Sequence, residues 1–279
     1  MTALVGRVAL GVAGFSFAPR DRSADLATIR SGIDAGTAIL DTARAYAHVD
    51  ATLYGEELAA EAARGTSVMV GTKGGHSRIG ATSWDADISE RRIRSDVETS
   101  LRVFGGEYLD LYYLHRVDLA EQPVEEGVSA LASLRDEGKV ARIGLSNVSI
   151  GALERATAVA RIDAVQNHHS SMGRESADVL AWCEANDVPF FAYSPVRSSA
   201  AAQAPRLAGM ANARGVSLQR LQLRALLASS PVLSVVSGAT RPETVLDSLA
   251  AESEPWDEDL EAAYTADLAL AVARAPREG

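Results

Sequence analysis

The chain has 279 residues, of which 47% are apolar and 23% are charged, and its 27 basic and 37 acidic residues give a formal net charge of −10. This is the composition of a globular protein, and the acidic balance argues against a nucleic-acid or anionic membrane surface, since both need a basic stripe. Cys183 is the only cysteine, so an intrachain disulfide is excluded and a cysteine-based zinc site is disfavoured.

The first apolar run, from Val8 to Ala18, has two interpretations. The favoured one is a folded first strand. The alternative is the apolar part of an export signal, but only Arg7 precedes the run as a charge, and Gly11 and Gly14 interrupt it. No apolar stretch approaches the roughly 18 residues of a membrane span. We therefore expect a cytoplasmic protein that binds neither membranes nor nucleic acid.

Short runs rich in β-branched and aromatic residues recur along the chain, and such runs predict buried strands. They are Val8–Ala13, Ala38–Ala43, Val68–Lys73, Asp110–His115, Arg142–Asn147, Val165–Ser170, Phe190–Pro195 and Leu233–Gly238. Longer stretches with helical periodicity follow them: Ala24–Ala35, Thr52–Arg64, Ser89–Phe104, Val124–Glu137, Ile150–Ala160, Glu175–Asn186, Leu218–Ala228 and Pro242–Leu249.

Strict alternation of strands and helices predicts parallel strands joined by crossover helices. Eight such units in a chain of this length indicate an α/β fold, a closed (β/α)₈ barrel of the TIM type. A doubly wound open sheet also alternates, but it usually begins with a G-x-G-x-x-G turn, and the first run here gives Gly11-Val12-Ala13-Gly14-Phe15. We expect residues 1–279 to form a single domain, with a last helix at about 257–274 on the barrel.

Polar side chains stand at the ends of three neighbouring predicted strands. Asp41 lies near the end of the second run, Lys73 and His115 end the third and fourth, and Tyr46 lies in the loop after Asp41. In such a barrel the active site is built from the carboxyl ends of the strands. Lys73 is one of only two lysines among the 27 basic residues, which suggests a need for a compact ammonium at this position.

These four groups suit proton transfer to a carbonyl oxygen. A nearby ammonium, Lys73, would lower the pKa of the Tyr46 phenol, and Asp41 would keep the lysine charged. Tyr46 could then donate a proton to a carbonyl oxygen, and His115 could hold that oxygen by a hydrogen bond. Because the four groups include no electron source, a hydride would have to come from a cofactor.

The chain resembles the aldo-keto reductase family through motifs that occur in the same order between about residues 8 and 250. The matching segments are Asp41-Thr42-Ala43-Arg44-Ala45-Tyr46, Gly71-Thr72-Lys73-Gly74-Gly75, Leu111-Tyr112-Tyr113-Leu114-His115, Gly138 to Asn147, Gln166-Asn167, Tyr193-Ser194-Pro195 and Gly238 to Glu243. It departs from the family at Ala47, where glycine is usual, at Ser237, where proline is usual, and at Asp247-Ser248, where a Glu-Asn pair is common.

The resemblance implies an NADPH-dependent oxidoreductase that reduces an aldehyde or ketone to an alcohol. Asp41, Tyr46, Lys73 and His115 would form its catalytic tetrad, with Tyr46 as the general acid. The expected cofactor-binding residues are Ser146, Asn147 and Gln166 at the carboxamide, Tyr193 on the nicotinamide ring, and Ser194, Gly238, Thr240, Arg241 and Asp247 towards the phosphate and adenosine end. Arg241 precedes Pro242 at a predicted helix start, a position that suits a 2′-phosphate and favours NADPH over NADH.

Three further residues are candidates for contact with a small carbonyl or alcohol substrate. His76 and Trp84 lie in a predicted rim loop, and His169 ends the sixth strand beside His168. Because neighbouring strand residues point to opposite faces, the two histidines are not expected to share a metal ion, and no metal is predicted.

Two other functions remain open from the sequence. A non-catalytic subunit of the same fold could bind the nicotinamide cofactor for regulation. A Schiff-base lyase could use Lys73 as its nucleophile, although the acidic and phenolic neighbours of Lys73 favour a charged lysine. The sequence leaves the substrate, the direction of the reaction and the oligomeric state open.

Overall fold

The computed structural model describes residues 6–17, 20–37, 39–47, 53–80, 83–196 and 203–274. Ala18, Ala38 and Thr52, which the sequence places at the end of the first apolar run and at the starts of a strand and a helix, lie outside the described residues.

Eight parallel strands close into a barrel in the order β1-β10-β9-β8-β7-β6-β3-β2. The strands are β1 (Val8–Gly11), β2 (Ile39–Asp41), β3 (Met69–Gly74), β6 (Leu111–Leu114), β7 (Ile143–Ser146), β8 (Ala164–His168), β9 (Phe190–Tyr193) and β10 (Leu233–Ser237). The barrel closes where β1 pairs with both β2 and β10, with Leu10 opposite Leu40 on one side and Ser237 on the other. Closure confirms the (β/α)₈ prediction and excludes the open sheet.

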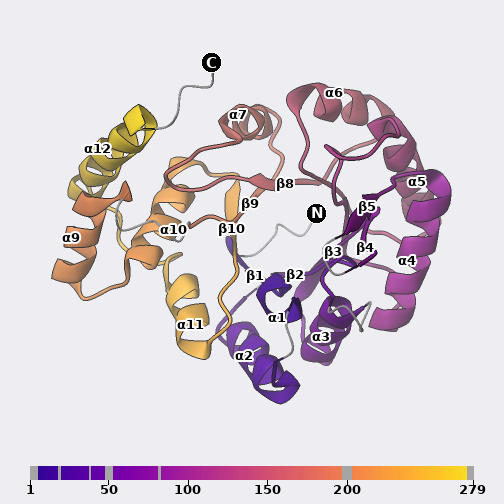
Figure 1. The fold of residues 1–279 in the computed structure, drawn as a ribbon, viewed down its shortest axis with the longest axis horizontal. Helices are drawn as coiled ribbons and strands as arrows, with labels where there is room; N and C mark the ends of the chain where they lie inside the picture. Colours follow the sequence, from indigo (N-terminus) through magenta and orange to yellow (C-terminus); the bar gives the residue numbers. More distant parts are fainter. Residues whose placement is uncertain are drawn as a thin grey trace.

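Helices surround this barrel as an outer ring (Figure 1). They are α2 (Arg22–Asp34), α3 (Tyr54–Ala63), α4 (Glu90–Phe104), α5 (Val124–Asp136), α6 (Ile150–Val159), α7 (Ala177–Ala185), α10 (Leu218–Ser229), α11 (Pro242–Ala250) and α12 (Glu258–Arg274). Local capping explains several bounds. The Asp21 side chain accepts from the backbone N–H groups of Ser23 and Ala24 at the start of α2, and Gly105 ends α4 in the left-handed conformation.

Two helices and one two-stranded hairpin were not predicted from the sequence. A short helix, α1 (Ala13–Ser16), follows β1, and the antiparallel hairpin of β4 (His76–Arg78) and β5 (Trp84–Ala86) follows β3. The helix α9 (Pro205–Arg214) precedes α10, so the described part of the crossover after β9 contains two helices. The loops that carry α1 and the hairpin follow the carboxyl ends of β1 and β3, the end of the barrel where active sites form.

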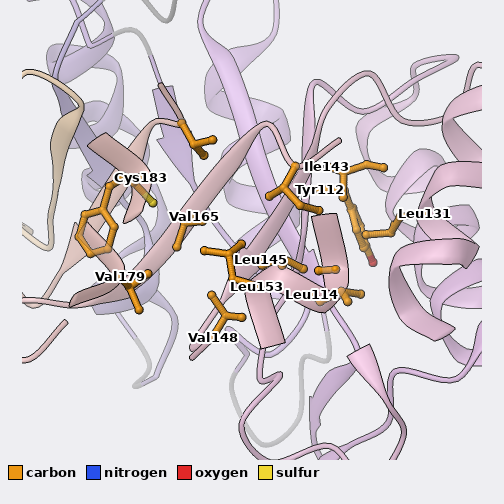
Figure 2. Close-up of a cluster of buried hydrophobic side chains, with 14 of the residues drawn as sticks. Tyr112, Leu114, Leu131, Ile143, Leu145, Val148, Leu153, Val165, Val179 and Cys183 are labelled. Atoms are coloured by element: carbon orange, nitrogen blue, oxygen red, sulfur yellow. The ribbon is translucent and has the colours of Figure 1, made fainter. Parts of the chain in front are cut away.

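The largest apolar cluster packs the outer face of β6, β7 and β8 against the surrounding helices. Figure 2 shows part of it, where Tyr112 and Leu114 of β6, Leu145 of β7 and Val165 of β8 lie close together. Cys183 belongs to the same cluster, and burial raises the pKa of its thiol to about 12, as is typical of an unreactive core cysteine. A separate cluster joins α9, α10 and α12 around Leu207, Leu221 and Leu260.

The predicted first strand is confirmed, because Val8 to Gly11 are buried and hydrogen-bonded on both sides within the barrel. Among the described residues, no helix combines the length and the apolar character that crossing a membrane requires.

Candidate active site

Asp41, Lys73 and Tyr46 meet at the carboxyl end of the barrel. Lys73 Nζ lies 2.8 and 2.7 Å from the two carboxylate oxygens of Asp41, and it also donates to the backbone carbonyl of Thr42 at 2.9 Å. The same nitrogen lies 3.4 Å from the hydroxyl oxygen of Tyr46. Lys73 is fully buried, so its charge is desolvated except for these contacts. Three of the four residues predicted for the tetrad are therefore in direct contact.

Burial and the lysine act in opposite directions on Tyr46. Burial raises the pKa of the phenol above 10, and the charge of Lys73 offsets only part of that rise. The sequence-based expectation of a net lowered pKa is wrong, because the cost of burying a phenolate, with the charge of Asp41, exceeds the attraction of one ammonium. Burial also disfavours the charged form of Lys73, but Asp41 and Tyr46 together outweigh it and raise the pKa of Lys73.

His115, the fourth predicted member of the tetrad, directly follows β6 and lies edge to face against Tyr46, with ring centroids 5.7 Å apart. Burial, and then the charge of Lys73, lower the pKa of His115 well below its ordinary value, so the imidazole is neutral at neutral pH. Its Nδ1 is buried and has no hydrogen-bond partner among the residues described. His115 is thus a neutral hydrogen-bonding group beside the phenol.

Gln166 extends this network across the barrel. Its side-chain nitrogen donates to Asp41 Oδ1 at 2.7 Å, so Asp41 accepts hydrogen bonds both from Lys73 on β3 and from Gln166 on β8. Next to it, Tyr193 donates its hydroxyl to Asn147 Oδ1 at 2.6 Å, and Asn147 donates to the backbone carbonyl of His115 at 2.9 Å. The residues predicted at the carboxamide are therefore linked by hydrogen bonds to the predicted tetrad.

A buried ionic cluster behind Tyr46 was missed by the sequence analysis. Arg44 lies 2.9 Å from Asp96 and 3.8 Å from Glu56, two residues that are almost fully buried. Glu56 Oε1 accepts hydrogen bonds from Thr72 and Ser100, each at 2.7 Å, while burial raises the pKa of Glu56. The cluster joins the loop of Tyr46 to β3, α3 and α4. Arg44 lies within the Asp41–Tyr46 segment and Glu56 follows it in α3, but their spacing along the chain does not indicate that they pair.

Gly55, at the start of α3, is packed directly against the backbone of Tyr46. Its N–H donates to the carbonyl of Tyr46 at 2.8 Å, and a Cβ at this position would lie 2.7 Å from that oxygen and 2.8 Å from Tyr46 Cβ. Any side chain here would displace the Tyr46 loop, so glycine is required by close approach.

A cavity of about 650 Å³ extends from Tyr46 to the start of α11. Its walls include five of the predicted cofactor residues, namely Tyr193, Ser194, Gly238, Thr240 and Arg241. Pro242 is the first residue of α11 and no side chain caps this helix, so its first N–H groups are available to an anion. The exposed Arg241 forms no ion pair with any residue the structure describes.

Asp247, the remaining predicted cofactor residue, does not line this cavity. Its carboxylate forms an ion pair with Arg220 at 2.7 Å and accepts a hydrogen bond from Ser217. Asp247 is on the side of α11 (Pro242–Ala250) that meets α10, and its two contacts join these helices.

A second cavity, of about 340 Å³, opens beside the first and shares Tyr46 and Tyr193 with it. His76 and Trp84, the two rim residues predicted to contact substrate, line it together with His115, Ser146, Asn147 and Gln166. Phe17, Arg116 and Leu119, none of which was predicted, also line it. They lie in loops after β1 and β6, where the sequence shows no periodicity to indicate them.

His169 was predicted to contact substrate, and the structure contradicts this. Its ring is fully buried against Phe190, with centroids 5.7 Å apart, and its Nδ1 accepts from the backbone N–H of Ser176. The neighbouring His168 stacks on Tyr193 instead, at 5.5 Å. Side chains alternate along a strand, so His168 shares the inward direction of Gln166, and His169 points out of the barrel.

Comparisons with known proteins agree with this geometry. The model of the Aldo/keto reductase family matches residues 7–265. An uncharacterized oxidoreductase of Schizosaccharomyces pombe is 28% identical over 225 residues, which cover 80% of this chain and 72% of that protein. A probable aldo-keto reductase of Glycine max is 32% identical over 189 residues, which cover 67% of this chain but only 54% of that protein.

Solved structures show the same fold. A glycerol dehydrogenase of Gluconobacter oxydans matches with a TM-score of 0.84 at 23% identity, covering 98% of this chain and 94% of that one. An aldo/keto reductase of Klebsiella pneumoniae in complex with NADP and acetate matches with a TM-score of 0.76 at 26% identity, covering 93% and 90%.

Proposed function

Because this chain belongs to the aldo/keto reductase family, we propose that it is an NADPH-dependent oxidoreductase that reduces an aldehyde or a ketone to an alcohol. The observation that carries the proposal is the buried chain of Asp41, Lys73 and Tyr46, which ends at the wall shared by the two cavities. A proton donor thus stands where a cofactor in one cavity and a carbonyl compound in the other would meet.

In this proposal Tyr46 is the general acid. Its raised pKa keeps the phenol protonated at neutral pH, so that it has a proton to donate to the carbonyl oxygen. Lys73 stabilises the phenolate that remains, and Asp41 holds the lysine charged and in place. His115, neutral and in contact with the Tyr46 ring, donates a hydrogen bond to the same oxygen.

The larger cavity fits a nicotinamide dinucleotide. Such a cofactor needs an anion site at one end and polar partners for a carboxamide at the other. In the larger cavity the uncapped start of α11 with Arg241 offers the first, and Ser146, Asn147 and Gln166, which line the adjoining smaller cavity, offer the second. Tyr193 lies between them, in both cavity walls. When bound, the reduced cofactor supplies the hydride that reaches the carbonyl carbon.

Arg241 supports a preference for NADPH over NADH. Its guanidinium is exposed, lies at the start of α11 and forms no ion pair within the part of the chain described, so it is free to receive a phosphate. A planar guanidinium matches a phosphate by two parallel hydrogen bonds, which a ribose hydroxyl cannot replace. Asp247, whose charge would oppose a phosphate, is neutralised by Arg220 outside the cavity.

The charged state of Lys73 argues against a Schiff-base lyase, because a nucleophilic lysine must be neutral. The test is a carbonyl panel of aromatic and aliphatic aldehydes and ketones, incubated with the purified protein and NADPH and followed by the loss of the reduced-nicotinamide absorbance. We expect turnover with wild type and its loss in Tyr46→Phe. Tight cofactor binding with no single-turnover oxidation of NADPH by any carbonyl compound would indicate a non-catalytic binding subunit instead.

A further inference from the structure

His76 presents an unused hydrogen-bond acceptor to the smaller cavity. The side chain is more than nine-tenths buried and lines the cavity beside His115. Its Nδ1 lies 2.6 Å from the backbone carbonyl oxygen of Asp85. A carbonyl oxygen can only accept, so Nδ1 carries the hydrogen, and Nε2 at the opposite edge of the ring is left with a lone pair. Within the described part of the chain, Nε2 has no hydrogen-bond partner.

The ring stays neutral, so Nε2 remains an acceptor. Burial lowers the pKa of His76 more than the Asp85 carbonyl raises it, and the positive charge of Arg116 lowers it further. An acceptor that lines a cavity is available to a ligand that brings a donor, and a ligand that covers it without a donor leaves it unpaired at a cost.

The position of the His76 ring is fixed from several sides. Trp84, on the partner strand of the hairpin, stacks on it nearly parallel, with centroids 5.2 Å apart. Gly75, just before His76, donates its N–H to Asp96 at 2.9 Å, and the hairpin is tied further by Asp85, which accepts from the N–H of Ser77 at 3.0 Å. The acceptor is therefore preorganised, which reduces the cost of using it in binding.

The His76 ring lies at a right angle to that of His115, with centroids 5.2 Å apart. Under the proposed function, His115 and Tyr46 hold the oxygen of the reacting carbonyl. A carbonyl oxygen about 2.9 Å from a ring nitrogen of His115 and a second oxygen about 2.9 Å from Nε2 of His76 can therefore be carried by neighbouring carbon atoms of one ligand. Beyond them, the cavity wall includes the exposed apolar side chains of Phe17, Trp84 and Leu119, and the one charged residue described there, Arg116, is paired with Asp118 at 2.7 Å.

We propose that the substrates are α-hydroxy carbonyl compounds with an apolar substituent, and that the hydroxyl next to the carbonyl donates a hydrogen bond to Nε2 of His76. The inference rests on the proposed function, because that function places the carbonyl at Tyr46 and His115. His76 is thereby a specificity-determining residue. A carbonyl compound without this hydroxyl leaves the buried acceptor unpaired, and a site built to hydrogen-bond a hydroxyl discriminates strongly on that ground.

The test compares two matched ketones, 2-hydroxy-1-phenylethanone and 2-methoxy-1-phenylethanone. Both carry an oxygen beside the carbonyl, but only the first has a hydroxyl hydrogen to donate. Binding is measured by calorimetry to the protein loaded with NADP⁺, a complex in which no hydride is available, and kcat/KM is measured with NADPH. The proteins are wild type, His76→Phe, which keeps a ring against Trp84 but has no acceptor, and His76→Gln, whose amide oxygen can reach the position of Nε2.

We expect wild type to favour the hydroxy ketone about tenfold in binding, the value of one hydrogen bond between neutral groups. His76→Phe should lose this preference, because it should bind the hydroxy ketone more weakly and the methoxy ketone as wild type does. His76→Gln should keep part of the preference. Equal binding of the two ketones by wild type, binding of neither, or an unchanged preference in His76→Phe would each overturn the inference. If His76→Phe does not fold, the wild-type and His76→Gln measurements still decide it.

The binding arm separates this inference from the proposed function. A hydroxyl preference in binding with no oxidation of NADPH would support the role of His76 and refute the reductase. Turnover of both ketones at equal kcat/KM by wild type would support the reductase and refute the role of His76.

Discussion

The ammonium nitrogen of Lys73 lies 3.4 Å from the hydroxyl oxygen of Tyr46 and 5.0 Å from the centroid of its ring. The contact joins a buried ammonium, whose pKa is raised, to a phenol that burial alone would make a weaker acid. It favours the phenolate form without removing the proton at neutral pH. The chemistry of the site therefore depends on the balance between a desolvation cost and one charge, and each of the two residues can be altered separately.

Replacing Tyr46 with phenylalanine removes the proton donor and keeps the ring. We expect Tyr46→Phe to fold normally, to bind NADPH with nearly unchanged affinity and to lose carbonyl reduction by a factor of about 10² to 10⁴, the usual contribution of a general acid. Steady-state rates and fluorescence titration with NADPH check this. Retention of more than about a tenth of the wild-type rate would show that another group donates the proton.

Replacing Lys73 with methionine removes the charge at similar side-chain volume. The pKa of Tyr46 should rise further, because burial is then unopposed, and turnover at neutral pH should collapse. Asp41 also loses its main partner, so we expect a destabilisation of about 3–5 kcal/mol, measured by urea unfolding. Lys73→Arg is the control, since it keeps the charge in a wider, planar group. Full activity in Lys73→Arg would show that charge alone is needed there.

Replacing Arg241 with alanine tests the cofactor preference. Loss of one charge-assisted contact should weaken the binding of NADPH by about 2 kcal/mol, roughly thirtyfold in Kd, and leave the affinity for NADH nearly unchanged. Arg94→Ala is a matched control, because Arg94 pairs with Glu90 and Glu137 on the outer surface, away from both cavities. Equal losses for both cofactors in Arg241→Ala would make Arg241 a structural residue.

His169 should make the fold sensitive to acid. Burial, followed by the charge of Arg174, lowers its pKa from 6.5 to about 4, with Glu175 acting the other way and His168 acting with Arg174. Between these two pH values the unfolded chain binds more protons than the folded one, so stability is lost as the pH falls from 6.5 towards 4. His115 adds to the same trend, because its pKa is lowered too.

Urea midpoints at pH 8, 6.5, 5 and 4.5 measure this dependence. His169→Asn keeps an acceptor for the Ser176 N–H and does not titrate, so its midpoint should start lower at pH 8 and fall less on acidification. A fall as steep as that of wild type would assign the acid sensitivity to other groups, His115 first.

Gly144 of β7 should tolerate no side chain. A Cβ there would overlap the ring of Tyr113 on the neighbouring strand β6, within the barrel, where neither strand can move freely. We expect Gly144→Ala to lower the free energy of unfolding by about 1–3 kcal/mol. Gly209→Ala is the control, since nothing lies within 4 Å of a Cβ at this helical position, and it should stabilise by about 0.5–1 kcal/mol. Equal effects of the two substitutions would contradict the overlap.

Most of the barrel could be predicted because its signal is local. Each buried strand is a short apolar run, and each helix repeats its apolar positions along its own length. The four tetrad candidates followed from the rule that parallel strands end on one edge. The hairpin of β4 and β5 escaped prediction because His76 to Ala86 contains no alternating apolar pattern, and α1 because four residues are too few to show periodicity.

Side-chain partners could not be predicted in the same way. Asp247 pairs with Arg220, which comes from another helix, and His76 is fixed by a backbone carbonyl on the opposite strand of its hairpin. Such pairings depend on how elements pack, which no spacing along the chain encodes. The prediction that His169 contacts substrate was avoidable. Gln166 was already expected to face the site, and in a strand the residue two positions on, His168, faces the same way.

The pairing of β1 with β10 has a consequence for the order in which the protein is made. Val8 and Val235 are partners in the barrel, so one edge of the first strand finds its neighbour only after nearly all of the chain has left the ribosome. Until then β1 can pair with β2 alone and exposes a row of free backbone groups. Contacts of such long sequence separation form slowly. We expect nascent chains that end before Leu233 to need protection from aggregation, and ribosome-bound chains that include Ser237 to acquire protease resistance.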